Sequence, residues 1–82
     1  MQKRFVYVIR NSADPPRYYL GLTSDVKRRL GEHNAGSCTH TAKYLPWYID
    51  VVVEFADERR AVALERYLKS RSGVAFAHRH LR

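Results

Sequence analysis

The chain has little cysteine and no long apolar run. Cys38 is the only cysteine among 82 residues, which excludes an internal disulfide and any cysteine-rich structural zinc site. No stretch approaches the roughly 18 apolar residues of a membrane span. The apolar residues 5–9 that follow Lys3 and Arg4 are fewer than the ~7–15 residues of a signal-peptide core. We therefore expect a cytoplasmic protein without membrane association.

Acidic residues are also scarce. Asp and Glu number 8 against 15 Lys and Arg, so the formal net charge is +7. Eleven of the basic residues are arginine, whose planar guanidinium binds phosphate through paired hydrogen bonds. Such an excess of charge on a small surface attracts polyanions, nucleic acid first among them. The alternative is a charge that serves only solubility.

The length leaves room for one small core, because a typical domain has about 100–150 residues. Hydrophobic residues make up 45% of the chain, which is normal for a globular domain and too high for a disordered segment. No repeat, low-complexity tract or linker interrupts the sequence. We expect residues 1–82 to form a single domain.

Three segments have the composition of strands. Residues 5–10 and 18–22 are rich in β-branched and aromatic side chains, and the turn formers between them indicate a hairpin. A third strand is expected over residues 48–55. Its apolar run predicts a central position in the sheet. Four of its side chains are expected to share the inward face: Ile49, Val51, Val53 and Phe55.

Helices are expected between and after these strands. The first spans residues 25–35, with an N-cap among residues 23–25 and Gly36 at its C-terminal end. Residues 37–45 are expected to form a loop, with room for one helical turn. A second helix follows Asp57 and is closed by Gly73, and residues 74–81 form a third. The order ββαβαα predicts an α+β fold, with a small, mainly antiparallel three-stranded sheet flanked by helices.

Several polar residues lie at positions that the helical pattern reserves for apolar ones. Arg29 and His33 share a helical face with Val26 and Leu30. They could present a cation and a proton carrier to one phosphate, or they could be a snorkelling arginine and a helix-end histidine. Glu65 borders the apolar stripe of the second helix, where it either reaches water or binds a cation.

The two early strands carry aromatic residues and one unusual glycine. Tyrosine is a favoured strand residue, so Tyr7 and Tyr19 could be packing residues only. Gly21 weakens a strand and often marks a close approach of the backbone to a side chain or ligand. Further aromatic residues could stack on bases or pack at the rim of the core: Tyr18, Tyr44, Trp47 and Tyr48.

Taken together, these residues resemble the GIY-YIG nuclease family. The likeness is to small stand-alone bacterial members, related to the nuclease domain of the repair excinuclease and to structure-selective endonucleases. It rests on segments in the family's order: residues 5–7 (FVY), 19–21 (YLG), 23–36 (TSDVKRRLGEHNAG), 46–47 (PW), 63–70 (ALERYLKS) and 73–76 (GVAF). The first segment lacks the motif's glycine and isoleucine, and Leu22 stands where some members carry lysine.

The resemblance implies roles for individual residues. Tyr7 and Tyr19 match the motif tyrosines that act at the attacking water, Arg29 the catalytic arginine, and His33 a frequent helper one turn later. Glu65 matches the glutamate that holds a single divalent cation, Mg²⁺ or Mn²⁺. We expect substrate contacts from Gly21 and from five basic residues: Lys27, Arg28, Lys43, Arg66 and Lys69.

The implied function is metal-dependent hydrolysis of DNA phosphodiester bonds in repair or recombination. Cleavage is expected to be structure-selective or weakly sequence-specific, with a protein partner for targeting. The alternative is a catalytically weak or inactive module that binds nucleic acid through the same basic cleft. Binding of either kind would weaken steeply as the salt concentration rises.

Overall fold

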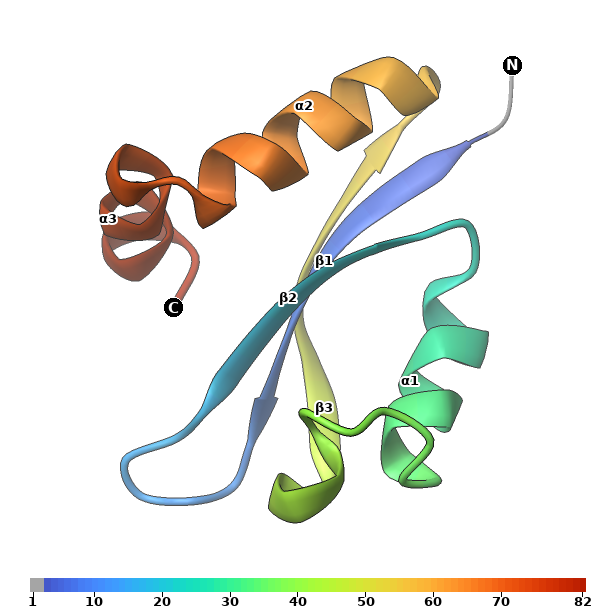
Figure 1. The fold of residues 1–82 in the computed structure, drawn as a ribbon, viewed down its shortest axis with the longest axis vertical. Helices are drawn as coiled ribbons and strands as arrows, with labels where there is room; N and C mark the ends of the chain where they lie inside the picture. The colour runs from blue at the N-terminus through green and yellow to red at the C-terminus, as the bar shows by residue number, and fades with distance from the viewer. Residues whose placement is uncertain (1–2) are drawn as a thin grey trace.

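Three strands and three helices make up the fold (Figure 1). The computed structural model describes residues 3–82, and its element order confirms the expected ββαβαα arrangement. The elements are β1 (Arg4–Asn11), β2 (Tyr18–Thr23), α1 (Val26–Asn34), the short 3-10 helix η1 (Ala42–Tyr44), β3 (Trp47–Phe55), α2 (Glu58–Lys69) and α3 (Arg71–His80). No helix within residues 3–82 is long and apolar enough to cross a membrane.

The strands form one antiparallel sheet in the order β2-β1-β3. The central strand is β1, in which Val6 to Ile9 are buried on both faces of the sheet. The expectation that the third strand is central is therefore wrong: β3 is an edge strand, and Tyr48 and Val52 on it are exposed. Its apolar composition reflects strand propensity rather than burial on two faces.

A bulge divides β3 into two halves that face opposite sides. Val8 pairs with Val51, and Ile9 pairs with Ile49, so β3 has one extra residue at this point. An extra residue reverses the alternation of side chains beyond it. Ile49 therefore does not share a face with Val51, Val53 and Phe55, contrary to the sequence expectation. The reversal places Trp47 on the same side of the sheet as Ile9, where both are buried.

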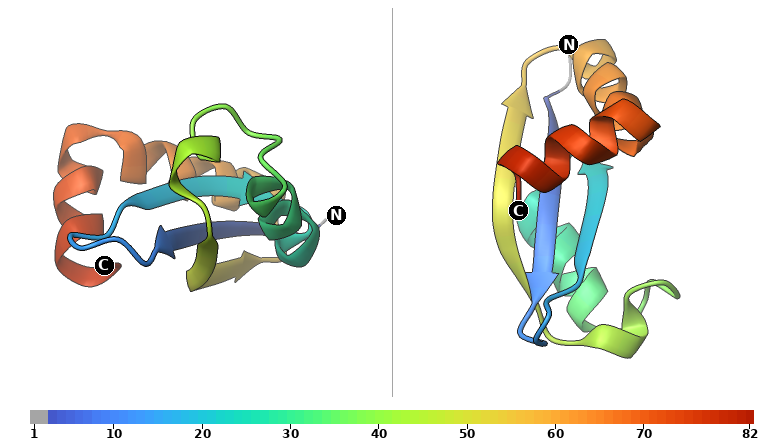
Figure 2. Two further views of the ribbon diagram at one scale, coloured as in Figure 1. Left: turned by 90° about the horizontal axis from the view of Figure 1, so that it is seen from below. Right: turned by 90° about the vertical axis from the view of Figure 1, so that its left-hand side faces the viewer.

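Each face of the sheet has its own core. α1 and η1 cover one face, over Tyr7, Ile9 and Trp47. α2 and α3 cover the other, where Ala61 and Leu68 of α2 belong to the buried cluster. The right-hand view of Figure 2 shows α2 and α3 in front of the sheet and α1 behind it. The strand β1 supplies buried side chains to both layers, so it holds the two halves of the domain together.

Helix α1 begins and ends as its sequence predicts. Asp25 is the N-cap, and its carboxylate accepts a hydrogen bond of 3.0 Å from the backbone N–H of Arg28. Gly36 adopts a φ of 79°, the left-handed conformation that favours glycine after a helix. These two termini fix the helical register, and with it the direction in which Arg29 and His33 point.

The second helix ends earlier than expected. α2 stops at Lys69, and Ser70 is the N-cap of α3, accepting a hydrogen bond of 3.2 Å from the backbone N–H of Gly73. Gly73 thus lies inside α3 and does not close α2, which corrects the sequence expectation. A side chain at this position would collide with the backbone carbonyl of Tyr67. The glycine therefore permits a tight junction between the two helices.

Gly21 has a comparable role in the sheet. It lies opposite Tyr7 in the β1–β2 register, and the Tyr7 ring covers it. A Cβ atom at residue 21 would lie 2.6 Å from Cζ and 2.8 Å from Cε1 of that ring. The absence of a side chain is thus what gives the phenol room over the neighbouring strand.

We predict that Gly21→Ala lowers the free energy of unfolding by about 1–3 kcal/mol, because the added methyl group overpacks against the Tyr7 ring. Gly31→Ala is the matched control, since a Cβ there meets nothing within 4 Å and alanine in a helix gains about 0.5–1 kcal/mol over glycine. Urea unfolding of both variants checks this. Equal effects of the two substitutions would contradict the assigned role of Gly21.

Candidate active site

The α1 face of the sheet gathers three of the residues that the sequence singles out. Tyr7 and Tyr19 come from adjacent strands, with ring centroids 6.5 Å apart. His33, in the last turn of α1, packs edge-on against both rings at centroid distances of 5.9 Å and 5.0 Å. We call Tyr7, Tyr19, His33 and the nearby Arg29 the tyrosine–histidine cluster.

His33 is the centre of a buried hydrogen-bonded chain. Its side chain is inaccessible to solvent. Nε2 lies 2.8 Å from the Tyr7 hydroxyl, and Nδ1 lies 2.8 Å from the hydroxyl of Thr41. The Thr41 hydroxyl donates to the carbonyl of Cys38 at 3.4 Å, so its oxygen is left to accept from Nδ1–H. The tautomer that satisfies every group carries its proton on Nδ1, and Tyr7 donates to Nε2.

The pKa values of the two buried partners favour their neutral forms. Burial lowers the pKa of His33 below its ordinary value of 6.5, and the positive charge of Arg29 lowers it further. Burial raises the pKa of Tyr7 above its ordinary value of 10.0, although Arg29 acts in the opposite direction. At neutral pH the cluster therefore contains a neutral phenol hydrogen-bonded to a neutral imidazole.

Arg29 supplies the positive charge beside this pair. Its Nη1 forms an ion pair of 2.7 Å with Oε1 of Glu32, three residues along the same helix. A hydrogen bond to Glu32 raises the pKa of Arg29 most, and a hydrogen bond to Tyr7 raises it further. The guanidinium is therefore always charged. Both side chains of the ion pair are about one-third exposed. Arg29 thus joins the buried phenol to the solvent-accessible surface of α1.

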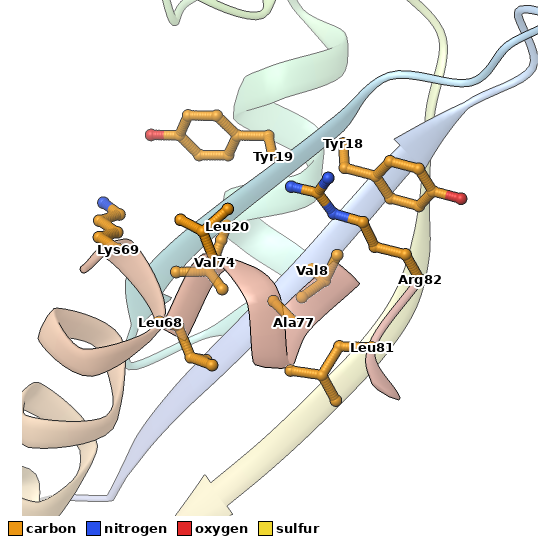
Figure 3. Close-up of a pocket in the computed structure, with 10 residues that line it drawn as sticks. All are labelled: Val8, Tyr18, Tyr19, Leu20, Leu68, Lys69, Val74, Ala77, Leu81 and Arg82. Atoms are coloured by element: carbon orange, nitrogen blue, oxygen red, sulfur yellow. The ribbon is translucent and has the colours of Figure 1, made fainter. Parts of the chain in front are cut away.

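Glu65 lies on the other layer, in α2, and within residues 3–82 its carboxylate pairs with a lysine rather than with the tyrosine–histidine cluster. Its Oε2 lies 2.6 Å from Nζ of Lys69, and its side chain is only 18% exposed. Lys69 and Tyr19 line one cavity (Figure 3). Tyr19, on the edge strand β2, is therefore the member of the cluster that shares a cavity with the lysine that pairs with Glu65.

A single carboxylate restricts the metal that Glu65 could hold. Residues 3–82 contain no group of three or more His, Cys, Asp or Glu side chains placed to hold a metal ion. One carboxylate does not make a zinc site, but it fits Mg²⁺, which keeps several of its waters and needs few protein ligands. The Lys69 ammonium is the cation that such an ion would displace from Glu65.

The basic residues expected to contact substrate divide between the two layers. Lys27 and Arg28 are exposed on α1, and Lys43 is exposed on η1. Arg66 and Lys69 are exposed on α2. The cations therefore lie on both sides of the β2 edge. Gly21 differs from them, since it is buried beneath the Tyr7 ring.

Sequence reasoning missed two residues of the site. Thr41 lies in the segment expected to be a loop, and nothing in the spacing of that segment connects it with His33. Glu32 enters the sequence prediction only as part of a longer motif, although an acid three residues after an arginine is a recognisable helical ion pair. Trp47 proves to be a packing residue, buried with its indole N–H donating to the carbonyl of Thr41 at 2.9 Å. It thereby holds the Thr41 segment against the sheet.

Comparisons with known proteins identify the family of the chain. Residues 3–75, a range that contains the whole cluster and Glu65, match the family model of the GIY-YIG catalytic domain. The UPF0213 protein ORF82 of Orgyia pseudotsugata multicapsid polyhedrosis virus is 36% identical over 74 residues, which cover 87% of this chain and 68% of that protein. A UPF0213 protein of Streptococcus pneumoniae is 34% identical over 68 residues, which cover 82% of this chain and 67% of that protein.

A UPF0213 protein of Bacillus cereus is 36% identical over 53 residues, which cover 63% of this chain and 55% of that protein. The chain thus spans about two thirds of the viral and streptococcal relatives and just over half of the Bacillus one. No solved structure matches it significantly.

We predict that Thr41→Val lowers the free energy of unfolding by about 1–3 kcal/mol, because Nδ1–H of His33 is left buried without an acceptor. Thr41→Ser keeps the hydroxyl and is the matched control. Urea unfolding measures the cost, and ¹⁵N NMR of the imidazole reports the position of the ring proton. A valine variant as stable as the serine variant would show that the hydroxyl does not orient His33.

The lowered pKa of His33 also predicts how stability depends on pH. The unfolded chain binds a proton at this residue near pH 6.5, whereas the folded chain binds it only at lower pH. Stability is therefore fully present above about pH 6.5 and falls as the pH drops through that value. Urea unfolding at about pH 7.5 and 5.5 should show the loss in the wild type and a smaller loss in His33→Gln. Equal losses would contradict the assignment.

Proposed function

This chain belongs to the GIY-YIG catalytic-domain family, a nuclease-type family, and we propose that it is a divalent-metal-dependent endonuclease that hydrolyses DNA phosphodiester bonds. The observation that carries the proposal is the buried hydrogen bond between Tyr7 and His33 beside the charged Arg29. A phenol, a proton acceptor and a fixed cation are the groups that activation of a water beside a phosphate requires.

Tyr7 acts as a relay, with His33 as the acceptor of the proton. Because the pKa of Tyr7 is raised, almost none of it is ionised at neutral pH. Tyr7 must therefore give its own proton away at the same time as it accepts one from the water. The water gives a proton to the Tyr7 oxygen, and the phenol gives its own to Nε2 of His33, 2.8 Å away. The hydroxide attacks phosphorus as the bond from phosphorus to the leaving oxygen breaks, and that oxygen takes a proton from solvent. Thr41 keeps Nε2 free to accept, because it occupies Nδ1–H.

Arg29 stabilises the negative charge that develops on the phosphoryl oxygens. Its pairing with Glu32 fixes the side chain before substrate binds, so little reorganisation is needed when the charge forms. The same guanidinium disfavours a second positive charge on His33. The imidazolium formed in the relay therefore tends to return its proton, which makes His33 a transient acceptor.

Glu65 is the residue that would hold a single Mg²⁺ or Mn²⁺. The ion would supply polarisation of the phosphoryl group and support for the leaving oxygen. Tyr19 borders both the cluster and the cavity that Lys69 lines, so a phosphate over the β2 edge would lie between the groups of the two layers. The five exposed basic residues on α1, η1 and α2 would hold the flanking phosphates.

The charge and the family resemblance support a proposal for the substrate structure and the cellular role. We assign structure-selective or weakly sequence-specific cleavage in repair or recombination, in the cytoplasm, with a protein partner for targeting. The support is the resemblance to repair nucleases and the net charge of +7, which favours contacts to phosphates over contacts to bases.

A binding module without catalysis is the second candidate. The observation that favours it is the Lys69–Glu65 ion pair of 2.6 Å, because the ammonium occupies the carboxylate that a metal would need. Leu22, in place of the lysine of some family members, removes another contact to phosphate. A protein of this kind would hold nucleic acid through its arginines and release it at high salt.

A cleavage assay separates these candidates. Labelled flaps, branches, duplexes and single strands are incubated with Mg²⁺, Mn²⁺ or EDTA. We predict metal-dependent cleavage that falls by about 10²–10⁴-fold in Tyr7→Phe, which removes the proton carrier, and by about 10²–10³-fold in Arg29→Ala. Glu65→Gln should abolish the response to metal. Arg71→Ala, which removes an exposed arginine of α3, is the matched control and should cleave normally.

Two results would count against the site. Full metal-dependent cleavage by both Glu65→Gln and Arg29→Ala would show that the chemistry occurs elsewhere. Salt-sensitive binding without cleavage of any substrate by the wild type would instead establish the binding module.

A further inference from the structure

One cavity takes no part in the relay between Tyr7 and His33. It has a volume of about 290 Å³ and lies between the edge strand β2 and the helices α2 and α3 (Figure 3). Tyr19 is the member of the tyrosine–histidine cluster that lines it. Apolar side chains line most of it: Val8, Leu20, Leu68, Val74, Ala77 and Leu81. An apolar hollow of this size at a sheet edge suits a planar ring rather than a phosphate.

Aromatic and cationic side chains complete the lining. Figure 3 shows Tyr19 and Lys69 on one side of the hollow and Tyr18 and Arg82 on the other. The guanidinium of Arg82 lies 5.0 Å from the centre of the Tyr18 ring. Within residues 3–82, no acidic side chain lines the cavity. The ammonium of Lys69 is paired with Glu65. Apolar surface, two tyrosines and the guanidinium of Arg82 remain, a combination that recognises a heterocyclic base attached to a phosphate.

Tyr19 connects this cavity with the proposed catalytic site. Its ring packs edge-to-face with His33 at a centroid distance of 5.0 Å, and the same residue lines the cavity. Because β2 is an edge strand, a nucleic-acid strand can cross it without obstruction by another strand. A phosphate bound near Tyr19 would therefore leave the base of an adjacent nucleotide close to the hollow.

We propose that this cavity binds one unpaired nucleobase next to the cleaved phosphodiester. A paired base cannot enter, because two helices and the sheet enclose the hollow on three sides, so the base must leave its stack and its partner. Single strands and the unpaired arms of branched DNA offer such a base without the cost of unpairing. The inference rests on the proposed function for the position of the cavity beside the cut, whereas base binding itself does not require catalysis.

Binding without metal tests the cavity separately from cleavage. Fluorescence anisotropy in EDTA measures the Kd of a labelled single-stranded DNA in which one abasic nucleotide is moved along the strand. An abasic site keeps the phosphate and removes the base. We expect about tenfold weaker binding at one or two positions and little change elsewhere, since a stacked base is worth that order of affinity.

Filling the hollow should remove this dependence on the base. Val74→Phe places a ring in the cavity from a position that is 47% exposed, and Val52→Phe makes the same change on β3 at a position that is 42% exposed. We expect Val74→Phe to bind the intact strand as weakly as the abasic one, and Val52→Phe to behave as the wild type. Blunt-duplex affinity should be the same in all three proteins.

Arg82→Ala is a second variant, at an exposed position where folding is not at risk. It should weaken single-strand binding and reduce the salt dependence by about one unit of slope. The cavity proposal is overturned if no abasic position weakens binding, or if Val74→Phe and Val52→Phe bind equally well. Base-dependent binding without any cleavage would support the cavity and contradict the nuclease proposal, so the two failures are distinguishable.

Discussion

The buried hydrogen bond between Tyr7 and His33 is the interaction on which the α1 half of the domain depends. It joins the central strand to the last turn of α1, which are 26 residues apart in the chain. Gly21 makes room for the phenol, Thr41 satisfies the other ring nitrogen, and Trp47 holds the Thr41 segment in place. Each polar atom in this chain of hydrogen bonds has a partner, as a buried polar network requires if it is to stabilise a fold.

The same burial sets the chemistry that the pair can perform. A buried imidazole loses its proton more easily, and a buried phenol holds its proton more tightly, so both partners are neutral at physiological pH. Arg29 places a permanent charge beside them, and Glu32 anchors it at the surface. The result is a neutral, buried hydrogen bond with a charged guanidinium on its solvent-accessible side, the arrangement on which the proposed relay rests.

The sequence predicts the fold well wherever the signal is local. The cap at Asp25 and the left-handed Gly36 follow from residue type, and the element order follows from hydrophobic periodicity. The edge position of β3 and its bulge could not be predicted in this way, because strand order and register depend on contacts with β1 that are remote in sequence. Thr41 could not be found either, since it lies in an aperiodic segment, eight residues from its partner His33. Family resemblance singled out Tyr7, Tyr19, Arg29 and His33, but the hydrogen bonds from His33 to Tyr7 and Thr41 became visible only in three dimensions.

The central claim is that neutral His33 accepts the proton that Tyr7 passes on. Its most direct test is the single-turnover rate of DNA cleavage with Mg²⁺ between about pH 5 and 8, in the wild type and in His33→Gln. We expect a wild-type rate that is level at neutral pH and falls on the acid side with a midpoint below the ordinary histidine pKa of 6.5, while the variant is slow and lacks this fall. A wild-type rate that is independent of pH in this range, or the same fall in His33→Gln, would contradict it.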